Sequence, residues 1–449
     1  GVANKLLKIM HSTQDRLGNF QKINWPLAFS VLDRTGKIQL TDQQKLAIQT
    51  ALTQKVSVLT GGPGTGKSTI TGSIIQLLKE KHATVLLAAP TGRAAKRLSE
   101  TTGLEAKTIH RLLEFNPSES VSFVRDRQNP LDADLIIIDE TSMVDILLMN
   151  HLLNAIEAGS HLLFVGDMDQ LPSVGAGNVL RDLIESKVIP VIRLDTIFRQ
   201  AEDSFIIVNA HRINNGEMPL FSKEAVDFFL FPETDALKAA DWVVDLVSER
   251  IQNKFGFDPI MDIQVLTPMH RGACGVTELN ERLQAALNPA DPRKAEVRHG
   301  SRVFRVGDRV MQIRNDYERK IFNGDLGVIA NIDTENHIVT VNFEERMVPC
   351  ETLQLEELVH AYAISIHKSQ GSEFPVVVIP LLMQHYMMLQ RNLVYTAVTR
   401  ARKLVVMVGD KKSIGMAVRN NKIASRNTLL KERLQLEPEK NNQDLFWNA

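Results

Sequence analysis

The stretch GGPGTGKS (residues 61–68) decides the fold of this chain. It follows an apolar, β-rich run, VSVLT (residues 56–60), and it precedes a stretch of helical length. A G-x-x-x-x-G-K-[ST] pattern between a strand and a helix predicts a phosphate-binding loop, because its glycines let backbone N–H groups converge on phosphate oxygens. Lys67 is expected to neutralise the β- and γ-phosphates of ATP, and Ser68 to bind Mg²⁺ through its hydroxyl. The predicted ATP-binding residues of this stretch are Gly62, Pro63, Gly64, Thr65, Gly66, Lys67, Ser68 and Thr69.

A pair of carboxylates ends another apolar run. LIIIDETSM (residues 135–143) reads as a buried strand followed by Asp139 and Glu140. Asp139 is expected to hold Mg²⁺, directly or through water, and Glu140 is placed to orient and deprotonate an attacking water. The loop and the pair together predict a nucleoside triphosphatase. Kinases, GTPases, transporters and helicases all use this framework, so the rest of the chain has to decide between them.

Outward from these two stretches, apolar strand-like runs alternate with amphipathic runs of helical length. Further strand-like runs lie at residues 84–89, 161–167, 188–194, 262–268, 376–382 and 404–410. Continuous apolar strands between helices predict parallel sheets that are covered on both faces, so the fold class is α/β with two such domains. Residues 300–356 have short alternating segments and turns such as Asn323-Gly324, which predict a small inserted antiparallel barrel.

The same pattern of strand-like and helical runs sets the expected domain limits. They are residues 1–35 for an N-terminal helical remnant, 36–192 for the first α/β domain, about 114–132 for a hairpin or plain loop within it, 193–299 plus 357–449 for the second α/β domain, and 300–356 for the barrel. Because the chain starts at Gly1 rather than Met, we expect that it is a piece of a longer protein.

Composition excludes several classes of protein. Lys and Arg number 52 against 53 Asp and Glu, so any site for a polyanion must be a local basic stripe. The two cysteines form no CxxC pair, which argues against a disulfide framework and a structural zinc and suits a reducing cytoplasm. The chain has no apolar stretch of about 18 residues and no secretory signal at its start, so no membrane span is expected.

Seven further segments occur in a fixed order, and together they resemble the motifs of superfamily 1 DNA helicases, within them the RecD-like group. They are LTDQQ (residues 40–44), AAPTGRAAKRL (88–98), TIHRLL (108–113), VGDMDQLPSVGAG (165–177), FRQ (198–200), AISIHKSQGSEF (363–374) and VYTAVTRAR (394–402). The resemblance covers about residues 38 to 435. It implies two RecA-like domains that hydrolyse ATP between them.

On the nucleotide side, the resemblance implies that Gln44 reads the adenine edge and that Gln170 senses the γ-phosphate. Arg199 and Arg400 would reach across the cleft from the second domain and stabilise charge on the γ-phosphate only when the cleft is closed. Glu373 would accept hydrogen bonds from the ribose hydroxyls.

On the DNA side, the resemblance implies contacts to the sugar-phosphate backbone, because basic groups and hydroxyls at helix starts suit phosphates and give no base readout. The residues concerned are Pro90, Thr91, Arg93, Lys96, His110, Ser365, His367 and Lys368. Phe198, Phe374 and Tyr395 are either core residues or platforms for base stacking, and Tyr395 is also a candidate to stack on adenine.

The RecD-like group, rather than another branch, is indicated by the short intervals between motifs. In that group the segment at residues 116–130 is a hairpin that splits the duplex, and the barrel is an SH3-like domain. The resemblance implies a monomer in the bacterial cytoplasm that translocates 5′→3′ on single-stranded DNA and acts at junctions with duplex. DNA repair or recombination is the implied setting, with other subunits of those systems as possible protein partners.

Three alternatives remain open. A helicase that acts on RNA, or on both RNA and DNA, is one, because backbone contacts leave the sugar as the sole discriminator. A second is a DNA-binding ATPase switch that clamps or translocates without unwinding. A small-molecule kinase or GTPase is disfavoured, because the chain has no NKxD pattern and that function leaves HKSQG and TRAR unexplained.

Overall fold

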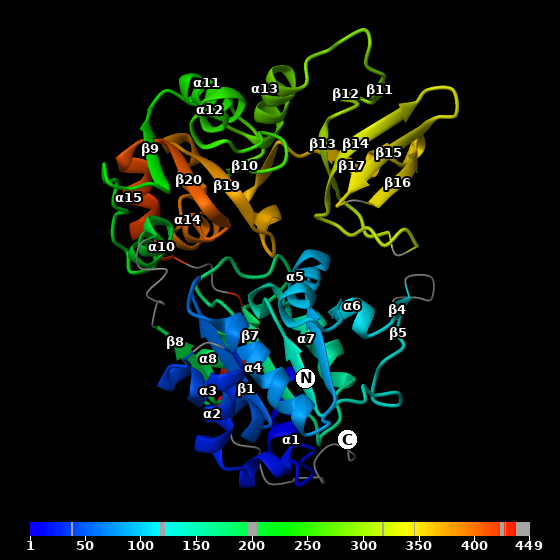
Figure 1. Ribbon diagram of the computed structural model, residues 1–449, viewed down its shortest axis with the longest axis vertical. Coiled ribbons are helices and arrows are strands. Elements are labelled where there is room, and N and C mark those ends of the chain that lie inside the picture. Colours follow the sequence, from blue (N-terminus) through cyan, green and yellow to red (C-terminus); the bar gives the residue numbers. More distant parts are fainter. Residues whose placement is uncertain are drawn as a thin grey trace, which may run out of the picture.

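Two α/β domains stacked along the long axis, with an antiparallel domain beside the upper one, make up the computed structural model (Figure 1). The structure describes residues 1–36, 39–116, 122–195, 204–316, 318–344, 346–422, 426 and 428–436. The predicted α/β class with an antiparallel insertion is confirmed. The helices in the described ranges include no candidate for a membrane-spanning segment.

The lower domain is built on a six-stranded sheet with the order β3-β2-β6-β7-β1-β8, in which all neighbouring strands are parallel. Its strands are β1 (Val56–Gly61), β2 (Val85–Ala89), β3 (Ala106–Thr108), β6 (Leu135–Ile138), β7 (His161–Gly166) and β8 (Val191–Leu194). Its helices include α3 (Asp42–Thr53), α4 (Lys67–Glu80), α5 (Gly92–Thr102), α6 (Ile109–Leu112), α7 (Ile146–Asn154) and α8 (Val179–Ser186). Alternate residues of each central strand enter two separate apolar cores, which explains why these strands are apolar throughout.

The upper domain repeats this plan with a five-stranded parallel sheet in the order β18-β10-β19-β20-β9. The strands are β9 (Phe228–Pro232), β10 (Ile263–Thr267), β18 (Ala363–Ser365), β19 (Phe374–Leu381) and β20 (Ala401–Gly409). The covering helices are α10 (Phe205–Asn214), α11 (Ala236–Asp245), α12 (Ile251–Phe255), α13 (Val276–Leu287), α14 (Arg391–Val398) and α15 (Lys411–Arg419). Two apolar cores again lie on the two faces of the sheet.

The SH3-like domain follows α13 and returns to the upper domain at β18. Its antiparallel sheet has the order β16-β15-β14-β13-β17 and encloses its own apolar core. The strands are β13 (Arg309–Gln312), β14 (Leu326–Asp333), β15 (Ile338–Phe343), β16 (Arg346–Glu351) and β17 (Leu358–His360), preceded by the hairpin of β11 (Glu296–His299) and β12 (Arg302–Arg305). Burial alternates along β15, as expected for a strand with one face on a core.

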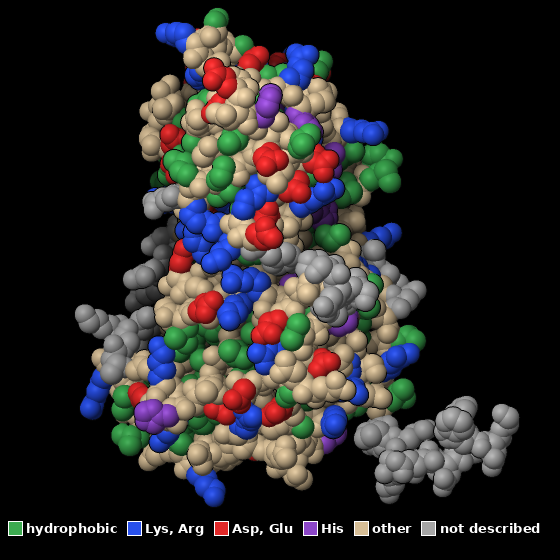
Figure 2. All heavy atoms as spheres, turned by 90° about the vertical axis from the view of Figure 1, so that its right-hand side faces the viewer, with side chains coloured by type: hydrophobic (Ala, Val, Ile, Leu, Met, Phe, Trp, Pro, Cys, Tyr) green, Lys and Arg blue, Asp and Glu red, His purple; other side chains and the backbone are tan. Residues whose placement is uncertain are grey.

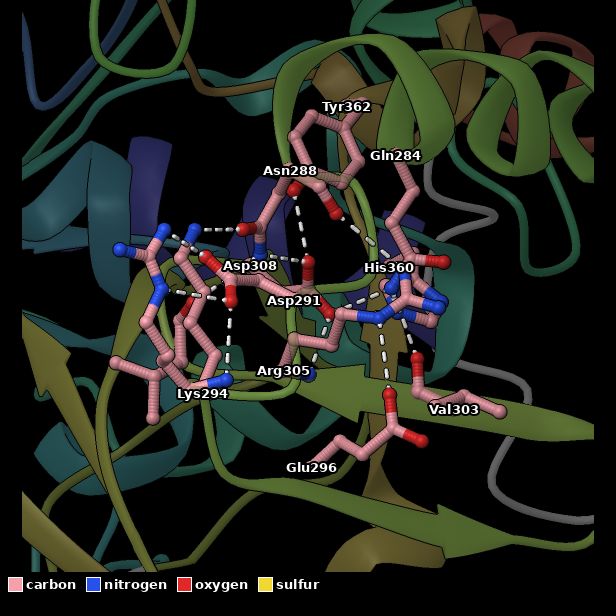
Figure 3. Close-up of polar contacts among 12 residues, drawn as sticks. Gln284, Asn288, Asp291, Lys294, Glu296, Val303, Arg305, Asp308, His360 and Tyr362 are labelled. Atoms are coloured by element: carbon pink, nitrogen blue, oxygen red, sulfur yellow. Dashed lines mark hydrogen bonds and ion pairs between the residues drawn. The ribbon is translucent and has the colours of Figure 1, made fainter.

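A buried carboxylate fastens the SH3-like domain to the upper domain (Figure 3). Asp308 accepts hydrogen bonds from Gln284 of α13 (2.7 Å), from Asn288 (2.7 Å) and from the hydroxyl of Tyr362 (2.9 Å). Burial alone would raise the pKa of Asp308, but hydrogen bonds from His360 and Asn288 lower it below its ordinary value. The hydrogen bonds that this buried carboxylate accepts hold its partners in defined positions, so the network fixes how the two domains meet.

Both ends of the described chain belong to the lower domain. Helix α1 (Val2–Met10) buries its apolar face in the core of that domain, and α2 (Trp25–Gly36) packs on the other face of the sheet. The pattern of residues 357–449 predicted an upper-domain segment, but α16 (Leu430–Gln435) crosses back and packs against α8 and α1. Its two buried leucines, Leu430 and Leu434, find their apolar surface there.

Candidate nucleotide and nucleic-acid site

The phosphate-binding loop forms the turn between β1 and α4, at the carboxyl edge of the lower sheet. Gly64 and Gly66 have φ values of 72° and 87°, a left-handed conformation that glycine adopts without strain. Nζ of Lys67 donates to the carbonyl oxygens of Gly61 (2.5 Å) and Gly62 (2.9 Å). Since no ion pair holds this ammonium group in the described part of the chain, it can turn toward a phosphate.

The two carboxylates lie directly after β6. Burial raises the pKa of Asp139 to about 6, and the charge of Glu140 acts in the same direction. Oδ1 of Asp139 accepts a hydrogen bond from the backbone N–H of Glu140 at 2.9 Å. Glu140 has a φ of 49°, which is left-handed and uncommon for a residue other than glycine. Strained backbone of this kind concentrates at functional sites.

A cleft of about 920 Å³ lies between the two α/β domains, within the size range of nucleotide-sized ligand sites. The lower domain contributes residues 62–69, Asp139, Glu140, Asp167 and Gln170, and the upper domain contributes Ser204, Ile207, Glu373, Thr399, Arg400 and Arg402. The tertiary structure therefore places the phosphate-binding loop, the carboxylate pair, Gln170, Glu373 and Arg400 around one space, although they come from distant parts of the sequence.

Arg400 enters this cleft from the upper domain as a buried side chain. Its Nη1 donates to the carbonyl oxygen of Ser372 (3.2 Å) and its Nη2 to the hydroxyl of Thr399 (3.4 Å). Its Nε is buried and has no hydrogen-bond partner among the described residues. The guanidinium group thus keeps donor capacity for a further acceptor in the cleft. The other predicted arginine, Arg199, lies outside the described residues.

The segment after β7 joins the two domains through hydrogen bonds. Tyr395 of α14 donates its hydroxyl hydrogen to Asp167 (2.8 Å), and Gln170 donates to the same carboxylate oxygen (3.2 Å). The hydroxyl of Thr396 accepts from the backbone N–H of Leu171 (2.9 Å). Burial raises the pKa of Asp167 and, with the charge of that carboxylate, the pKa of Tyr395. Tyr395 is therefore a buried interdomain contact in this structure.

Two other predicted nucleotide contacts have protein partners. Oε1 of Gln44 accepts from the backbone N–H of Thr41 (3.0 Å) and completes a helix-capping box, and Gln44 does not line the cleft. Its Nε2 is buried without a partner among the described residues. Glu373 forms ion pairs with Arg97 (2.5 Å) and Arg402 (2.8 Å). Both arginines line the cleft, and the sequence predicted neither as a nucleotide contact, although Arg97 lies in the AAPTGRAAKRL segment and Arg402 in the TRAR segment.

The predicted DNA contacts of the lower domain lie around the start of α5. Pro90 follows β2, and Thr91 caps α5 by accepting from Ala94 (3.3 Å). Thr91 faces Gly371 of the upper domain, whose Cβ, if present, would lie 2.7 Å from the threonine hydroxyl. This close approach explains the need for glycine in the HKSQG segment.

The basic groups of α5 are engaged across domain boundaries. Arg93 donates to the hydroxyl of Ser372 (2.9 Å), and its guanidinium carbon lies 5.6 Å from the ring centre of Phe374, which is a core residue. Burial lowers the pKa of Arg93. Lys96 forms an ion pair with Glu344 of the SH3-like domain. Both groups would have to exchange these partners to meet a phosphate.

The remaining predicted DNA contacts lie in η5 (Ile366–Ser369) and on α6. Ser365 caps η5 by accepting from the backbone N–H of Lys368 (3.4 Å), and Nζ of Lys368 donates to Asn323 of the SH3-like domain (2.9 Å). Burial lowers the pKa of His367 and of His110. His110 packs against the rings of a hairpin described below rather than standing free on the surface.

The insertion predicted at residues 114–132 begins as a hairpin of β4 (Phe115–Asn116) and β5 (Ser122–Phe123). Its base is an aromatic cluster in which the ring centres of Phe115 and Phe123 lie 5.0 Å apart and those of Phe123 and His151 4.4 Å apart. The tip, residues 117–121, is outside the described residues.

Lys and Arg side chains gather on one face where the upper and lower halves of the molecule meet (Figure 2). This is the face that carries the SH3-like domain and the hairpin, on the right-hand side of Figure 1. A near-neutral chain thus concentrates positive charge locally, as a site for a polyanion requires.

Comparison with known proteins identifies three regions. Family models match residues 44–176 (AAA domain), 279–343 (ATP-dependent RecD-like DNA helicase SH3 domain) and 360–408 (UvrD-like helicase C-terminal domain). Among solved structures, the Pif1 helicase from Candida albicans aligns with a TM-score of 0.49 and 22% identity over 84% of this chain and 97% of that one.

Two curated relatives are more informative. The chain is 38% identical over 397 residues to the ATP-dependent RecD2 DNA helicase of Deinococcus radiodurans, covering 88% of this chain and 52% of that protein. It is 34% identical over 426 residues to the RecBCD enzyme subunit RecD of Mycolicibacterium smegmatis, covering 88% of this chain and 75% of that protein. The chain thus spans about half the length of the first relative and three quarters of the second. It belongs to the RecD-like family of superfamily 1 DNA helicases.

Proposed function

We propose that this chain hydrolyses ATP in the cleft between its two α/β domains and uses the reaction to move along single-stranded DNA. The observation that carries the proposal is the position of Arg400, which faces the phosphate-binding loop from the opposite domain. An arginine in this position reaches the transferring phosphate only while the cleft is closed, so ATP favours closure and hydrolysis releases it. Repeated closing and opening supplies a stepping motion.

Mg²⁺ fits the proposed site. Ser68 and Asp139 both line the cleft, and a hydroxyl and a carboxylate are the oxygen donors that this ion prefers. When bound, the ion neutralises charge on the β- and γ-phosphates. Lys67 binds phosphate oxygens, Glu140 orients the attacking water and accepts its proton, and Arg400 stabilises the charge that develops.

The other nucleotide roles are part of the same proposal. Gln170 senses the γ-phosphate, and its bond to Asp167 connects that signal to Tyr395 of the upper domain. Gln44 reads adenine through its unpartnered Nε2. Glu373 binds ribose after leaving an arginine partner, and Arg199 adds a second positive charge to the closed cleft.

The proposed track for DNA is the basic boundary between the two halves, lined by the eight predicted contacts from Pro90 to Lys368. Contacts of this kind hold the backbone with steep salt dependence and little base preference. We assign 5′→3′ movement and strand separation by the hairpin. The printed name of one relative, an ATP-dependent DNA helicase, supports DNA as the substrate. The chain would act as a cytoplasmic monomer in bacterial DNA repair or recombination, at junctions of single-stranded and duplex DNA and alongside other subunits of those systems.

Strand displacement on two duplexes, one with a 5′ single-stranded tail and one with a 3′ tail, tests this function. Only the 5′-tailed duplex is expected to open, and Lys67→Ala is expected to abolish both unwinding and ATP hydrolysis while DNA binding persists. Opening of only the 3′-tailed duplex contradicts the polarity. If neither opens while single-stranded DNA still stimulates hydrolysis, the chain is a translocating or clamping ATPase, and equal stimulation by RNA makes the substrate class wrong.

A further inference from the structure

A histidine of the upper domain reaches the phosphate-binding loop. His211 lies on α10, at the edge of the upper domain that faces the lower one (Figure 1). A Cβ placed on Gly62 would lie 3.7 Å from Cε1 and 3.8 Å from Nε2 of His211, and 3.0 Å from the hydroxyl oxygen of Tyr395. The imidazole and the phenol thus both lie close to Gly62, and the absence of a side chain there leaves room for the tyrosine hydroxyl.

The two side chains differ in how their polar atoms are satisfied. The hydroxyl of Tyr395 is bonded to Asp167 at 2.8 Å. Nε2 of His211 is buried and has no hydrogen-bond partner among the described residues. Native proteins satisfy nearly all buried polar atoms, so an unsatisfied ring nitrogen close to the phosphate-binding loop calls for a partner that the described residues do not supply, and a ligand atom is such a partner.

The surroundings of Gly62 indicate what that ligand atom is. Nζ of Lys67 is bonded to the carbonyl oxygens of Gly61 and Gly62, and the lysine of such a loop binds the β- and γ-phosphates. We therefore expect the outer end of a bound triphosphate near Gly62, the residue that His211 approaches. Ser204 and Ile207, which precede His211 on the same segment, already line the cleft.

The charge around His211 suits a hydrogen-bond donor. Burial lowers the pKa of His211, while the carboxylates of Asp167, Asp169 and Asp195 act in the opposite direction. A neutral imidazole carries one N–H, and the tautomer with hydrogen on Nε2 directs it to the loop. No metal or covalent step is needed for this contact.

We propose that His211 is a contact for the terminal phosphate of bound ATP, donating a hydrogen bond from Nε2 to a γ-phosphate oxygen when the cleft closes. Helix α10 packs against α14, which carries Tyr395 and leads into Arg400, so the contact reports the triphosphate state to the upper domain independently of Arg400. This inference rests on the proposed ATPase function and adds a recognition residue to it.

Equilibrium binding of two fluorescent nucleotides, mant-ATPγS and mant-ADP, to the full chain in the presence of Mg²⁺ tests the proposal. His211→Phe keeps a ring but removes the donor, and it is expected to weaken mant-ATPγS binding on the order of tenfold, as for loss of a hydrogen bond to a charged group. Binding of mant-ADP is expected to change by less than about twofold. His211→Gln, whose amide N–H₂ replaces the ring donor, is expected to restore most of the lost affinity.

His11→Phe, an exposed histidine on the lower domain next to α1, is the matched control and is expected to bind both nucleotides as the unaltered chain does. Unchanged mant-ATPγS binding by His211→Phe overturns the inference. Equal weakening of both nucleotides, without recovery in His211→Gln, assigns the histidine a structural role and also overturns it. Absence of ATP hydrolysis by the unaltered chain is a separate result, which contradicts the proposed function itself.

Discussion

At the scale of the residue, Glu140 combines an unusual backbone conformation with a proposed catalytic role. Its φ of 49° costs conformational energy that a catalytic position can justify, because the turn brings its carboxylate to the cleft beside Asp139. Glu140→Gln keeps the size of the side chain and removes the proposed base. ATP turnover is expected to fall about 100-fold or more, with nucleotide binding retained, because general-base catalysis contributes on that order. Phosphate release and mant-ATP binding measure the two effects, and normal turnover would remove Glu140 from this role.

Arg400 allows a second residue-scale prediction. Its Nε is buried and has no hydrogen-bond partner among the described residues, and the side chain lines the cleft opposite the phosphate-binding loop. Both observations support the proposal that Arg400 acts on the transferring phosphate. Arg400→Ala is expected to lower the rate of hydrolysis about 1000-fold while nucleotide affinity changes far less. Arg419→Ala, at the end of α15, is the control for loss of an arginine from the same domain. Parallel loss of binding and hydrolysis in Arg400→Ala would make it a structural residue.

At the scale of the element, the hairpin is held by its aromatic base. Phe115 and Phe123 pack with His110 and His151, so the two strands are anchored on α6 and α7. Phe123→Ala removes the ring that contacts the other three, and it is expected to reduce unwinding of a 5′-tailed duplex several-fold. DNA-stimulated ATP hydrolysis is expected to remain, because the cleft is not touched. Replacement of residues 116–130 by a short Gly-Ser linker should have the same but larger effect, and unchanged unwinding would contradict the wedge role.

A buried histidine in the upper domain is expected to make the stability of the fold depend on pH. His385 lies in η6 (Met383–Met388) with its Nδ1 accepting from the backbone N–H of Leu382 (3.2 Å), and burial lowers its pKa to about 4. Below pH of about 6.5, the ordinary pKa of histidine, His385 is protonated in the unfolded chain but stays neutral in the folded chain. The folded state is therefore most stable at neutral pH, and this part of its stability is lost as the pH falls toward 4.

The size of this effect can be measured. Between pH 7 and pH 5 the unaltered chain is expected to lose about 2 kcal/mol of unfolding free energy through His385. His385→Asn keeps an acceptor that does not titrate. Its unfolding free energy, measured by urea denaturation at both pH values, should therefore fall by about 2 kcal/mol less than that of the unaltered chain. Identical slopes would show that His385 is not protonated on unfolding in this range.

At the scale of the whole molecule, the SH3-like domain lies on the proposed DNA track. Glu344 pairs with Lys96, and Asn323 accepts from Lys368, so two predicted phosphate contacts are bonded to this domain. DNA has to replace both partners. The network around Asp308 fixes the SH3-like domain to the upper domain, so in the proposed motor we expect the two to move together.

Glu344→Gln frees Lys96, and it is expected to raise affinity for a labelled oligo-dT strand about two- to fivefold at low salt, the range of an exposed ion pair. Screening should remove most of the gain at high salt. Glu335→Gln makes the same charge change at an exposed turn of the SH3-like domain. Equal affinities for the two variants in fluorescence anisotropy would show that the Glu344 contact does not compete with DNA.

Local sequence determined the two α/β domains, the phosphate-binding loop and the carboxylate pair. Their signals are contiguous: apolar runs that must be buried on both faces of a sheet, glycines at φ values of 72° and 87°, and carboxylates at the end of β6. Neighbouring residues set these features, so a pattern of a few residues encodes them. The alternating strands predicted the antiparallel insertion for the same reason, whereas its SH3-like character came from the resemblance to the RecD-like group.

Only the tertiary structure decided which groups face one another. Several contacts join residues that lie far apart in the chain. Glu373 pairs with Arg97 and Arg402, and α16 returns to the lower domain. The SH3-like domain bonds Lys96 and Lys368, and His211 approaches Gly62. Such contacts depend on how preformed domains pack. A lysine or histidine in a helical pattern has the same local sequence whether it meets solvent, phosphate or a neighbouring domain, so no local pattern distinguishes these outcomes.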